Sequence, residues 1–208
     1  MTLRARDEVH LTRRIWHFCG VISMALTYWF STQQHSLILA IIISIVLISS
    51  DVLRLYSRRF NRVAIWIFKR IIRDSEAHRI SGMTYMMTGV TLIVALYPKN
   101  VVFLTLLCFA IADPLASEVG IRFGKDKLIG NKSLQGSLAA FVACFIISFV
   151  FFQSLKLIPE RAFLACLLTG LSGAISELVP IGKLDDNFTF PVLNATLLTG
   201  VMYVFGGL

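Results

Sequence analysis

Charge is scarce in this sequence, and acidic charge is the scarcest. Of the 208 residues, 15% are charged, with 12 Asp and Glu against 20 Lys and Arg, whereas 56% are hydrophobic. A water-soluble domain of this length needs more polar surface than these residues supply, which excludes the ordinary soluble globular class. The sequence therefore predicts a single integral membrane domain over residues 1–208, with little length left for a soluble appendage.

Paired cysteines are also missing. The four cysteines, Cys19, Cys108, Cys144 and Cys166, all fall inside apolar segments, and no C-x-x-C pair occurs among them. We interpret them as packing residues, which argues against a disulfide framework or a cysteine metal site.

Long apolar stretches, by contrast, are abundant. Seven of them, each about 16–22 residues long, cover approximately residues 15–31, 36–53, 82–97, 100–121, 134–153, 162–180 and 190–208. The first resembles the core of a signal peptide, but residues 32–35 offer no small-residue cleavage site and six more stretches follow. The predicted fold class is all-α, a polytopic membrane helix bundle of about seven transmembrane helices.

Basic and hydrophobic residues alternate between the second and third stretches. In this segment Phe60, Ile67 and Phe68 are interleaved with Arg59 and Arg62. The pattern predicts an interfacial amphipathic helix near residues 58–75, lying among anionic headgroups. A soluble linker helix is the alternative.

The Lys and Arg residues are distributed unevenly along the chain. Seventeen of the 20 fall on one side of the predicted helices, leaving only Lys99, Lys156 and Arg161 on the other. Because loops rich in Lys and Arg stay in the cytosol, the N-terminus is predicted to be cytosolic and the C-terminus outside. The net charge of +8 then reflects topology, and no nucleic-acid partner is expected.

A polar segment with two glycines, Gly130–Ser137, precedes the fifth apolar stretch on the predicted cytosolic side. Ser133 is the expected N-cap of the following helix, whose free N–H groups favour anions, and Lys132 adds a positive charge beside them. Asn131, Lys132, Ser133 and Gly136 are therefore candidate phosphate-binding residues. The G-x-x-x-x-G-K-[ST] spacing of a phosphate-binding loop is absent, and an ordinary cytosolic loop is the alternative.

Small residues follow an aspartate near the end of the fourth stretch. Asp113, Ser117, Gly120 and Gly124 recur every three or four residues, which places them on one helical face. The small side chains on this face would allow a ligand to approach closely, and Gly120 and Gly124 are candidate nucleotide-binding residues. A helix-packing stripe with one tolerated aspartate is the alternative.

Oxygen ligands gather around the sixth loop, in Glu177, Asp185, Asp186 and Asn187. Mg²⁺ favours carboxylates together with substrate phosphates, and a metal that bridges phosphate oxygens neutralises charge in phosphoryl transfer. We interpret the three carboxylates, with Asp113, as candidate metal ligands and Asn187 as a supporting residue. A solvated turn with an Asp-Asn cap is the alternative.

Arg13, Arg14 and His17 open the first stretch. The arginines are candidates for clamping phosphate and His17 for a supporting role, with snorkelling side chains as the alternative. Asp51 and Arg54 end the second stretch three residues apart and are predicted to form an ion pair, with support of the site as the functional alternative.

Glu76 and Tyr85 lie around the start of the third stretch. We assign both to structural support of the site.

Taken in order, these residues resemble the polyprenol kinase family of membrane lipid kinases, whose relatives include dolichol kinase, phytol kinase and the CTP-dependent diacylglycerol kinase. The matching segments are Arg13-Arg14-x-x-His17, Glu76 through Gly82-x-x-Tyr85, Asp113-x-x-Ala116-x-x-x-Gly120-x-x-x-Gly124, Asn131-Lys132-Ser133-x-x-Gly136-Ser137, and Glu177 followed by Asp185-Asp186-Asn187 and Pro191. Pro114 departs from the pattern, where a small polar residue is expected.

The resemblance implies transfer of the γ-phosphoryl group of a nucleoside triphosphate, commonly CTP, to a membrane lipid alcohol such as a polyprenol, a phytol-like prenol or diacylglycerol. It also implies a divalent metal such as Mg²⁺ and an active site facing the cytosol. Asp113, Lys132 and Arg14 become the candidate catalytic residues, with Asp113 binding metal or accepting the hydroxyl proton. The sequence predicts no oligomeric state.

Two other functions are weighed against the kinase. Phosphatidate cytidylyltransferase carries an S-x-x-K-R-x-x-K-D signature that this sequence lacks. A small transporter often has repeated halves and polar groups at mid-membrane. Here no repeat is evident, and the polar groups gather at one interface.

Overall fold

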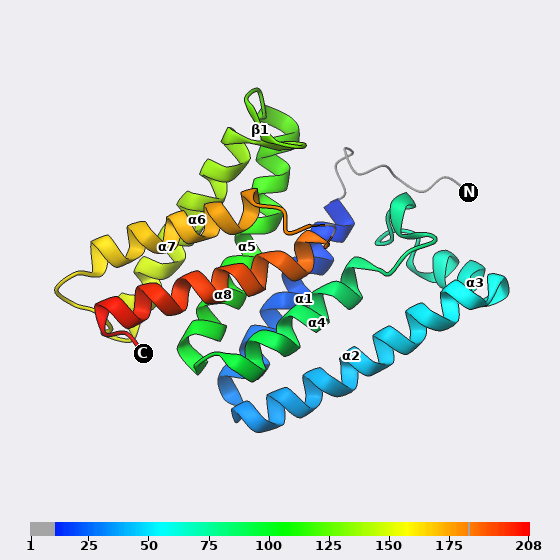
Figure 1. Ribbon diagram of the computed structural model, residues 1–208, viewed down its shortest axis with the longest axis horizontal. Coiled ribbons are helices and arrows are strands. Elements are labelled where there is room, and N and C mark those ends of the chain that lie inside the picture. The colour runs from blue at the N-terminus through cyan, green and yellow to red at the C-terminus, as the bar shows by residue number, and fades with distance from the viewer. Residues whose placement is uncertain (1–10, 183) are drawn as a thin grey trace.

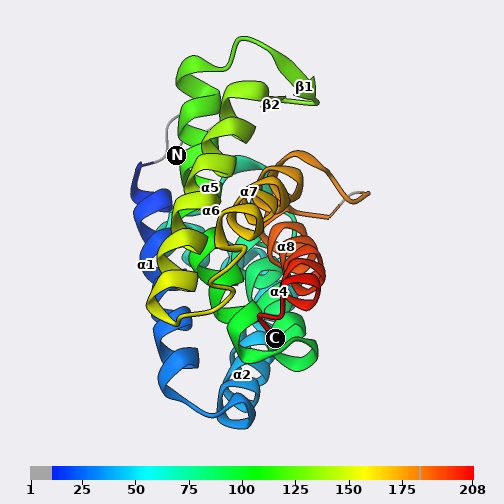
Figure 2. The ribbon, with the colours of Figure 1, turned by 90° about the vertical axis from the view of Figure 1, so that its left-hand side faces the viewer.

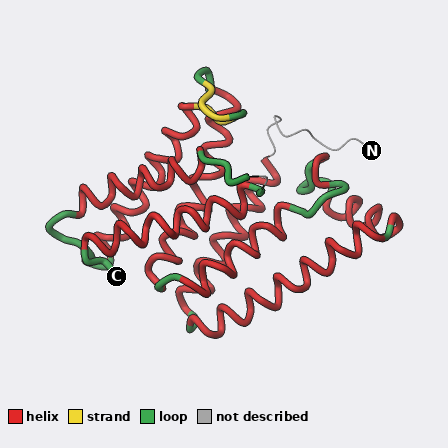
Figure 3. The backbone as a smooth tube through the Cα atoms, viewed as in Figure 1, coloured by secondary structure: helices red, strands yellow, loops and turns green. Residues whose placement is uncertain are grey.

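The computed structural model describes residues 11–182 and 184–208, so Arg4, Arg6 and Lys183, which entered the charge count, lie outside it. The described part forms eight α-helices, one short 3-10 helix and one hairpin (Figures 1 and 3). The elements are α1 (Leu11–Phe30), α2 (Gln33–Tyr56), α3 (Arg58–Phe68), η1 (Asp74–Glu76), α4 (Gly82–Leu96), α5 (Lys99–Phe123), β1 (Lys127–Ile129), β2 (Lys132–Ser133), α6 (Leu134–Ser154), α7 (Ala162–Leu178) and α8 (Asp186–Phe205). The predicted all-α fold is confirmed, and each of the seven apolar stretches coincides with a helix.

Four helices of the described chain, α2, α5, α6 and α8, are long and apolar enough to cross a membrane. α4 and α7 are apolar but shorter, and α1 begins with charged residues. On α2, large aliphatic side chains such as Ile45 and Val46 are exposed, as suits contact with lipid.

The centre of the bundle is α5. It packs against α1 on one side and against α6 and α8 on others, while α4 lies between α8 and α2 (Figures 1 and 2). Leu104, Cys108 and Phe109 of α5 are fully buried, and Phe109 stacks on Phe190 of α8. This packing fixes the part of α5 that carries Asp113 relative to α1 and α8.

A short antiparallel hairpin between α5 and α6 was not predicted. Lys127 pairs with Ser133 and Ile129 with Lys132, and Gly130 occupies the turn with a positive φ of 57°. Because glycine has no Cβ, it takes this conformation without steric cost. The segment expected to be a simple loop therefore has a defined backbone that carries Lys132.

The amphipathic helix is shorter than predicted. α3 ends at Phe68, not near residue 75, and the chain continues through η1 to the start of α4. Within α3, Val63, Trp66 and Ile67 are exposed, which agrees with the predicted apolar face. We call residues 69–81 the arginine loop; four of its backbone carbonyls accept hydrogen bonds from side chains of α1, α2 and α3.

Candidate active site

Lys132 lies at the junction of the hairpin with α7 and α8. Its Nζ is 2.8 Å from Glu177 Oε1 and 3.2 Å from Asp186 Oδ2. The second oxygen of Glu177 accepts a hydrogen bond of 3.0 Å from Ser137 Oγ on α6. Glu177 is almost fully buried, whereas Lys132 and Asp186 are half-buried. Lys132 thus joins two of the four carboxylates predicted to hold metal.

The electrostatic surroundings keep Lys132 charged. Burial alone lowers the pKa of Lys132, but the negative charges of Asp186, Glu177 and Asp113 outweigh it and hold the pKa above its ordinary value. Asp113 contributes less to this pKa than Asp186 and Glu177, which contact the lysine directly.

Asp113 faces α1 as well. Its Oδ2 is 3.8 Å from His17 Nε2, and the His17 ring packs edge-on against Phe109 with ring centroids 4.6 Å apart. Asp113 therefore lies on the side of α5 that faces the start of α1. It is the first residue of the predicted helical face that continues through Gly120 and Gly124.

Arg14 forms an ion pair with Glu118, which also pairs with Arg122 one turn later. The sequence reasoning did not single out Glu118. Its spacing to Arg122 is a visible i,i+4 pair, but nothing in the local sequence indicates the contact with Arg14.

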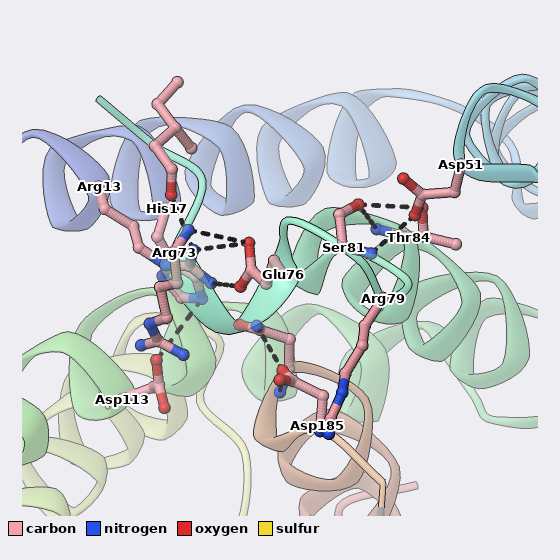
Figure 4. Close-up of polar contacts among 12 residues, drawn as sticks. Arg13, His17, Asp51, Arg73, Glu76, Arg79, Ser81, Thr84, Asp113 and Asp185 are labelled. Carbon is pink, nitrogen blue, oxygen red and sulfur yellow. Dashed lines mark hydrogen bonds and ion pairs between the residues drawn. The ribbon is translucent and has the colours of Figure 1, made fainter. Parts of the chain in front are cut away.

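Arg13 is held by the arginine loop. Its guanidinium makes a two-pronged contact with the Glu76 carboxylate, at 2.7 and 3.1 Å, and donates a third bond of 2.8 Å to the carbonyl oxygen of Ile71 (Figure 4). A Cβ at Gly82 would lie 2.8 Å from Arg13 Nη2 and 2.7 Å from Asn187 Nδ2, so a larger residue here would displace the tips of both side chains where the loop, α1 and α8 meet. Glu76, predicted to be a supporting residue, thus contacts Arg13 directly.

The predicted ion pair of Asp51 and Arg54 is present, with 3.0 Å between Arg54 Nη2 and Asp51 Oδ1. Both side chains are buried. Asp51 also accepts bonds of 2.7 Å from the Ser81 N–H and from Thr84 Oγ1, which fixes the start of α4.

The small residues of the stripe lie against α6. A Cβ at Gly136 would be 2.9 Å from the Ala116 carbonyl oxygen, and one at Gly120 or Gly124 would press on Ser133 Oγ. Ser133 is the predicted N-cap of α6, since its Oγ accepts the Gly136 N–H at 3.2 Å. These glycines bring two helices together at the hairpin and thereby position Lys132.

The remaining predicted residues have local roles in the geometry. Asp185 caps α8 by accepting the Asn187 N–H at 3.0 Å and the Asn187 side-chain amide at 2.6 Å. The Asn131 carbonyl accepts a bond of 3.2 Å from Lys127 Nζ in the exposed hairpin. Tyr85 lies half-buried in the first turn of α4.

The carboxylates do not form a ready-made metal cage. Within residues 11–182 and 184–208, no group of three or more His, Cys, Asp or Glu side chains is arranged to hold a metal ion. Mg²⁺ that enters with a nucleotide needs only one or two carboxylates, because phosphate oxygens and waters supply the rest. Glu177 and Asp186, both turned toward Lys132, fit that smaller demand.

Comparison with known proteins finds relatives along most of the chain. The CTP-dependent diacylglycerol kinase 1 of Schizosaccharomyces pombe is 30% identical over 164 residues, which cover 74% of this chain and 75% of the relative. The enzyme of the same name from Saccharomyces cerevisiae is 28% identical over 180 residues, covering 77% of this chain and 62% of the relative. That of Eremothecium gossypii is 29% identical over 207 residues, covering 89% and 65%.

No family model matches the chain, and no solved structure matches it. The identity and coverage shared with the Schizosaccharomyces pombe enzyme are sufficient to assign the family. The chain belongs to the polyprenol kinase family of lipid kinases, in which its relatives are CTP-dependent diacylglycerol kinases.

Proposed function

We propose that this chain is a membrane kinase that transfers the γ-phosphoryl group of CTP to the hydroxyl of a lipid alcohol. Diacylglycerol is the first candidate acceptor, because three relatives are named for it. The observation that carries the proposal is the cluster of Lys132, Glu177 and Asp186, with Asp113 in electrostatic reach, at one end of a largely apolar bundle. A cation among carboxylates suits a phosphate chain with its metal.

The proposed topology has seven membrane spans, α1, α2 and α4 through α8, with the N-terminus in the cytosol. It is supported by the order of the helices along the chain, and by the concentration of Lys and Arg in the loops at the active-site end. α3 then lies at the cytosolic interface, where its arginines meet anionic headgroups. The active site opens to the compartment that holds nucleotides.

On the nucleotide side, Lys132 neutralises phosphate charge, and Glu177 and Asp186 would hold Mg²⁺ together with the phosphate oxygens. When bound, the metal stabilises negative charge on the transferring group. The N-terminal end of α8 lies beside this cluster, because Asp186 is its first residue. Its helix dipole adds to the attraction for an anion.

On the lipid side, Asp113 is placed to accept the hydroxyl proton. The hydroxyl oxygen forms a bond to the γ-phosphorus, the bond from that phosphorus to the β–γ bridging oxygen breaks, and CDP leaves with the electron pair. Asp113 retains the proton until it is exchanged with water. Its position near His17, within α5, matches a hydroxyl held at headgroup depth while the acyl chains stay in the bilayer.

The experiment is an activity matrix with purified full-length protein in lipid nanodiscs. γ-labelled CTP and ATP are each offered with diacylglycerol, a polyprenol and phytol, with Mg²⁺ and with EDTA. We expect label in the lipid phase with CTP and diacylglycerol and none with EDTA. Absence of labelled lipid for every combination would refute the proposed function.

A further inference from the structure

The arginine loop, which contains the short 3-10 helix η1, has a fixed backbone. Arg54 of α2 donates bonds of 2.8 Å to the Glu76 carbonyl oxygen and 2.5 Å to the Arg79 carbonyl oxygen. Asn61 of α3 donates a bond of 3.0 Å to the Ala77 carbonyl oxygen. Arg54 has only 3% of its surface exposed, so its guanidinium is fully committed to this task. Side-chain donors here supplement the few backbone hydrogen bonds of the loop, such as that from the Arg79 N–H to the Glu76 carbonyl.

Both ends of the loop are held too. Arg13 of α1 bonds to the Ile71 carbonyl oxygen near the beginning, and Asp51 of α2 accepts the Ser81 N–H at the end. Side chains from three helices thus hold this one connection, and several of those side chains are charged and largely buried.

The side chains that the clamped loop presents are arginines. Figure 4 shows Arg73 extending from the loop toward His17 and Asp113, and Arg79 extending toward Asp185 at the start of α8. His17 and Asp113 are themselves 3.8 Å apart, so Arg73 points into the candidate site. Arg79 is exposed and, among the described residues, makes no ion pair.

The arginines of α1 have identified partners. Arg13 is bound in the two-pronged contact with Glu76 and by the Ile71 carbonyl, and Arg14 is bound to Glu118. Arg13 and Arg14, predicted from the sequence to clamp phosphate, are therefore both bound to protein groups.

The start of α8 separates the loop from the hairpin. On one side Asp186 pairs with Lys132, and on the other Asn187 lies against Gly82, the residue that follows the loop. A phosphate chain along the first turn of α8 would therefore have Lys132 on one side and the loop on the other.

We propose that Arg73 and Arg79 are the second phosphate-binding element of this site, opposite Lys132, and that Arg54 and Arg13 are positioning residues that hold them there. The inference rests on the proposed function, because it assigns the phosphates to a bound nucleotide. Guanidinium groups suit the role, since each can donate two parallel bonds to a phosphate.

The test measures equilibrium binding of CTP with Mg²⁺, and of CMP, to the full-length protein in nanodiscs. Arg73→Gln and Arg79→Gln should each weaken CTP binding by roughly 10- to 100-fold, the range for a hydrogen bond to a charged group, and change CMP binding less than about threefold. Arg70→Gln, an exposed arginine of the same loop, is the matched control and should leave both affinities unchanged.

Arg54→Lys tests the positioning role. A lysine ammonium cannot bond to both the Glu76 and the Arg79 carbonyl as the Arg54 guanidinium does. CTP binding should therefore fall, although Arg54 does not reach the nucleotide. Unfolding temperatures confirm that each variant is folded.

Arg73 and Arg79 variants that bind CTP like the wild type would overturn the inference, as would equal losses for CTP and CMP. Either outcome is compatible with the formation of labelled lipid by the wild-type protein. Failure of the proposed function is a separate result: no labelled lipid from the wild type with any acceptor.

Discussion

At the scale of single residues, the proposed function assigns Lys132 to the nucleotide and Asp113 to the lipid. Lys132 is held by Glu177 and Asp186, so its charge is balanced until a phosphate chain and its metal arrive. Asp113 lies deeper, toward His17 and the apolar core at Phe109. The two residues influence each other through charge, which suits groups that act on opposite ends of one transferred phosphoryl group.

Replacement of Asp113 by Asn tests the lipid side. The amide has the same shape but cannot take up the hydroxyl proton, so we expect lipid phosphorylation to fall by about 10²- to 10⁴-fold while CTP binding and the unfolding temperature stay near wild type. Near-normal phosphorylation by this variant would remove Asp113 from the mechanism.

The pH dependence of stability tests the nucleotide side. Because the folded-state pKa of Lys132 lies above its ordinary value of 10.5, its ion pairs contribute stability fully below about pH 10.5 and lose it as the pH rises through the folded value. The difference in unfolding free energy between wild type and Lys132→Met should therefore be constant from about pH 7 to about pH 9 and shrink only above that.

Lys127→Met is the matched control. Lys127 is an exposed lysine of the same hairpin, bonded to one carbonyl, and its replacement should leave the unfolding free energy nearly unchanged at every pH. A wild-type advantage over Lys132→Met that already disappears between about pH 7 and about pH 9 would contradict the charge balance described.

At the scale of elements, the contact between α5 and α6 sets the position of the hairpin. Gly136 of α6 faces the Ala116 carbonyl of α5 so closely that a Cβ would be 2.9 Å from that oxygen. A backbone atom cannot move aside as a side-chain tip can, so the two helices must separate to admit a methyl group.

Gly136→Ala should therefore lower the free energy of unfolding by about 1–3 kcal/mol and weaken CTP binding through Lys132. Gly200→Ala, in α8, meets no atom within 4 Å and should leave stability unchanged or raise it by up to about 1 kcal/mol. Denaturation in detergent compares the two; equal stability of both variants would show that the glycine contact does not constrain α6.

The elements also show how far sequence reasoning reaches. The seven apolar helices were predictable because hydrophobic length is a local property, and the N-cap at Ser133 and the Asp51–Arg54 pair follow from short spacings. The position of the arginine loop was not, because it is held largely by side chains that are distant along the chain. Arg13 and Glu76 are 63 residues apart, and no local pattern indicates that they meet.

The site could be predicted in part for the same reason. Counting helices placed Asp113, Lys132 and Asp186 at one end of the bundle without saying which would touch. The structure joins Lys132 with Glu177 and Asp186, whereas it turns Asp185 into a helix cap.

At the scale of the whole molecule, the account depends on orientation in the membrane. The hairpin and the loop between α6 and α7 lie at opposite ends of α6. In the proposed topology the hairpin is therefore cytosolic and the α6–α7 loop is outside.

Single cysteines test this. In a Cys19→Ser background, which removes the one exposed cysteine among the described residues, Lys127→Cys should react with an impermeant maleimide only from the cytosolic side and Glu160→Cys only from the opposite side. Both positions are exposed. The reverse pattern would invert the topology and move the active site away from cytosolic CTP.

The central claim is phosphoryl transfer from CTP to lipid, and the position of the label tests it most directly. Purified protein is given diacylglycerol or phosphatidate with CTP labelled either at the γ- or at the α-phosphate. The account predicts that only γ-label enters the lipid, with diacylglycerol as acceptor, and that α-label stays in CDP. Transfer of α-label to phosphatidate would show a cytidylyltransferase and contradict the account.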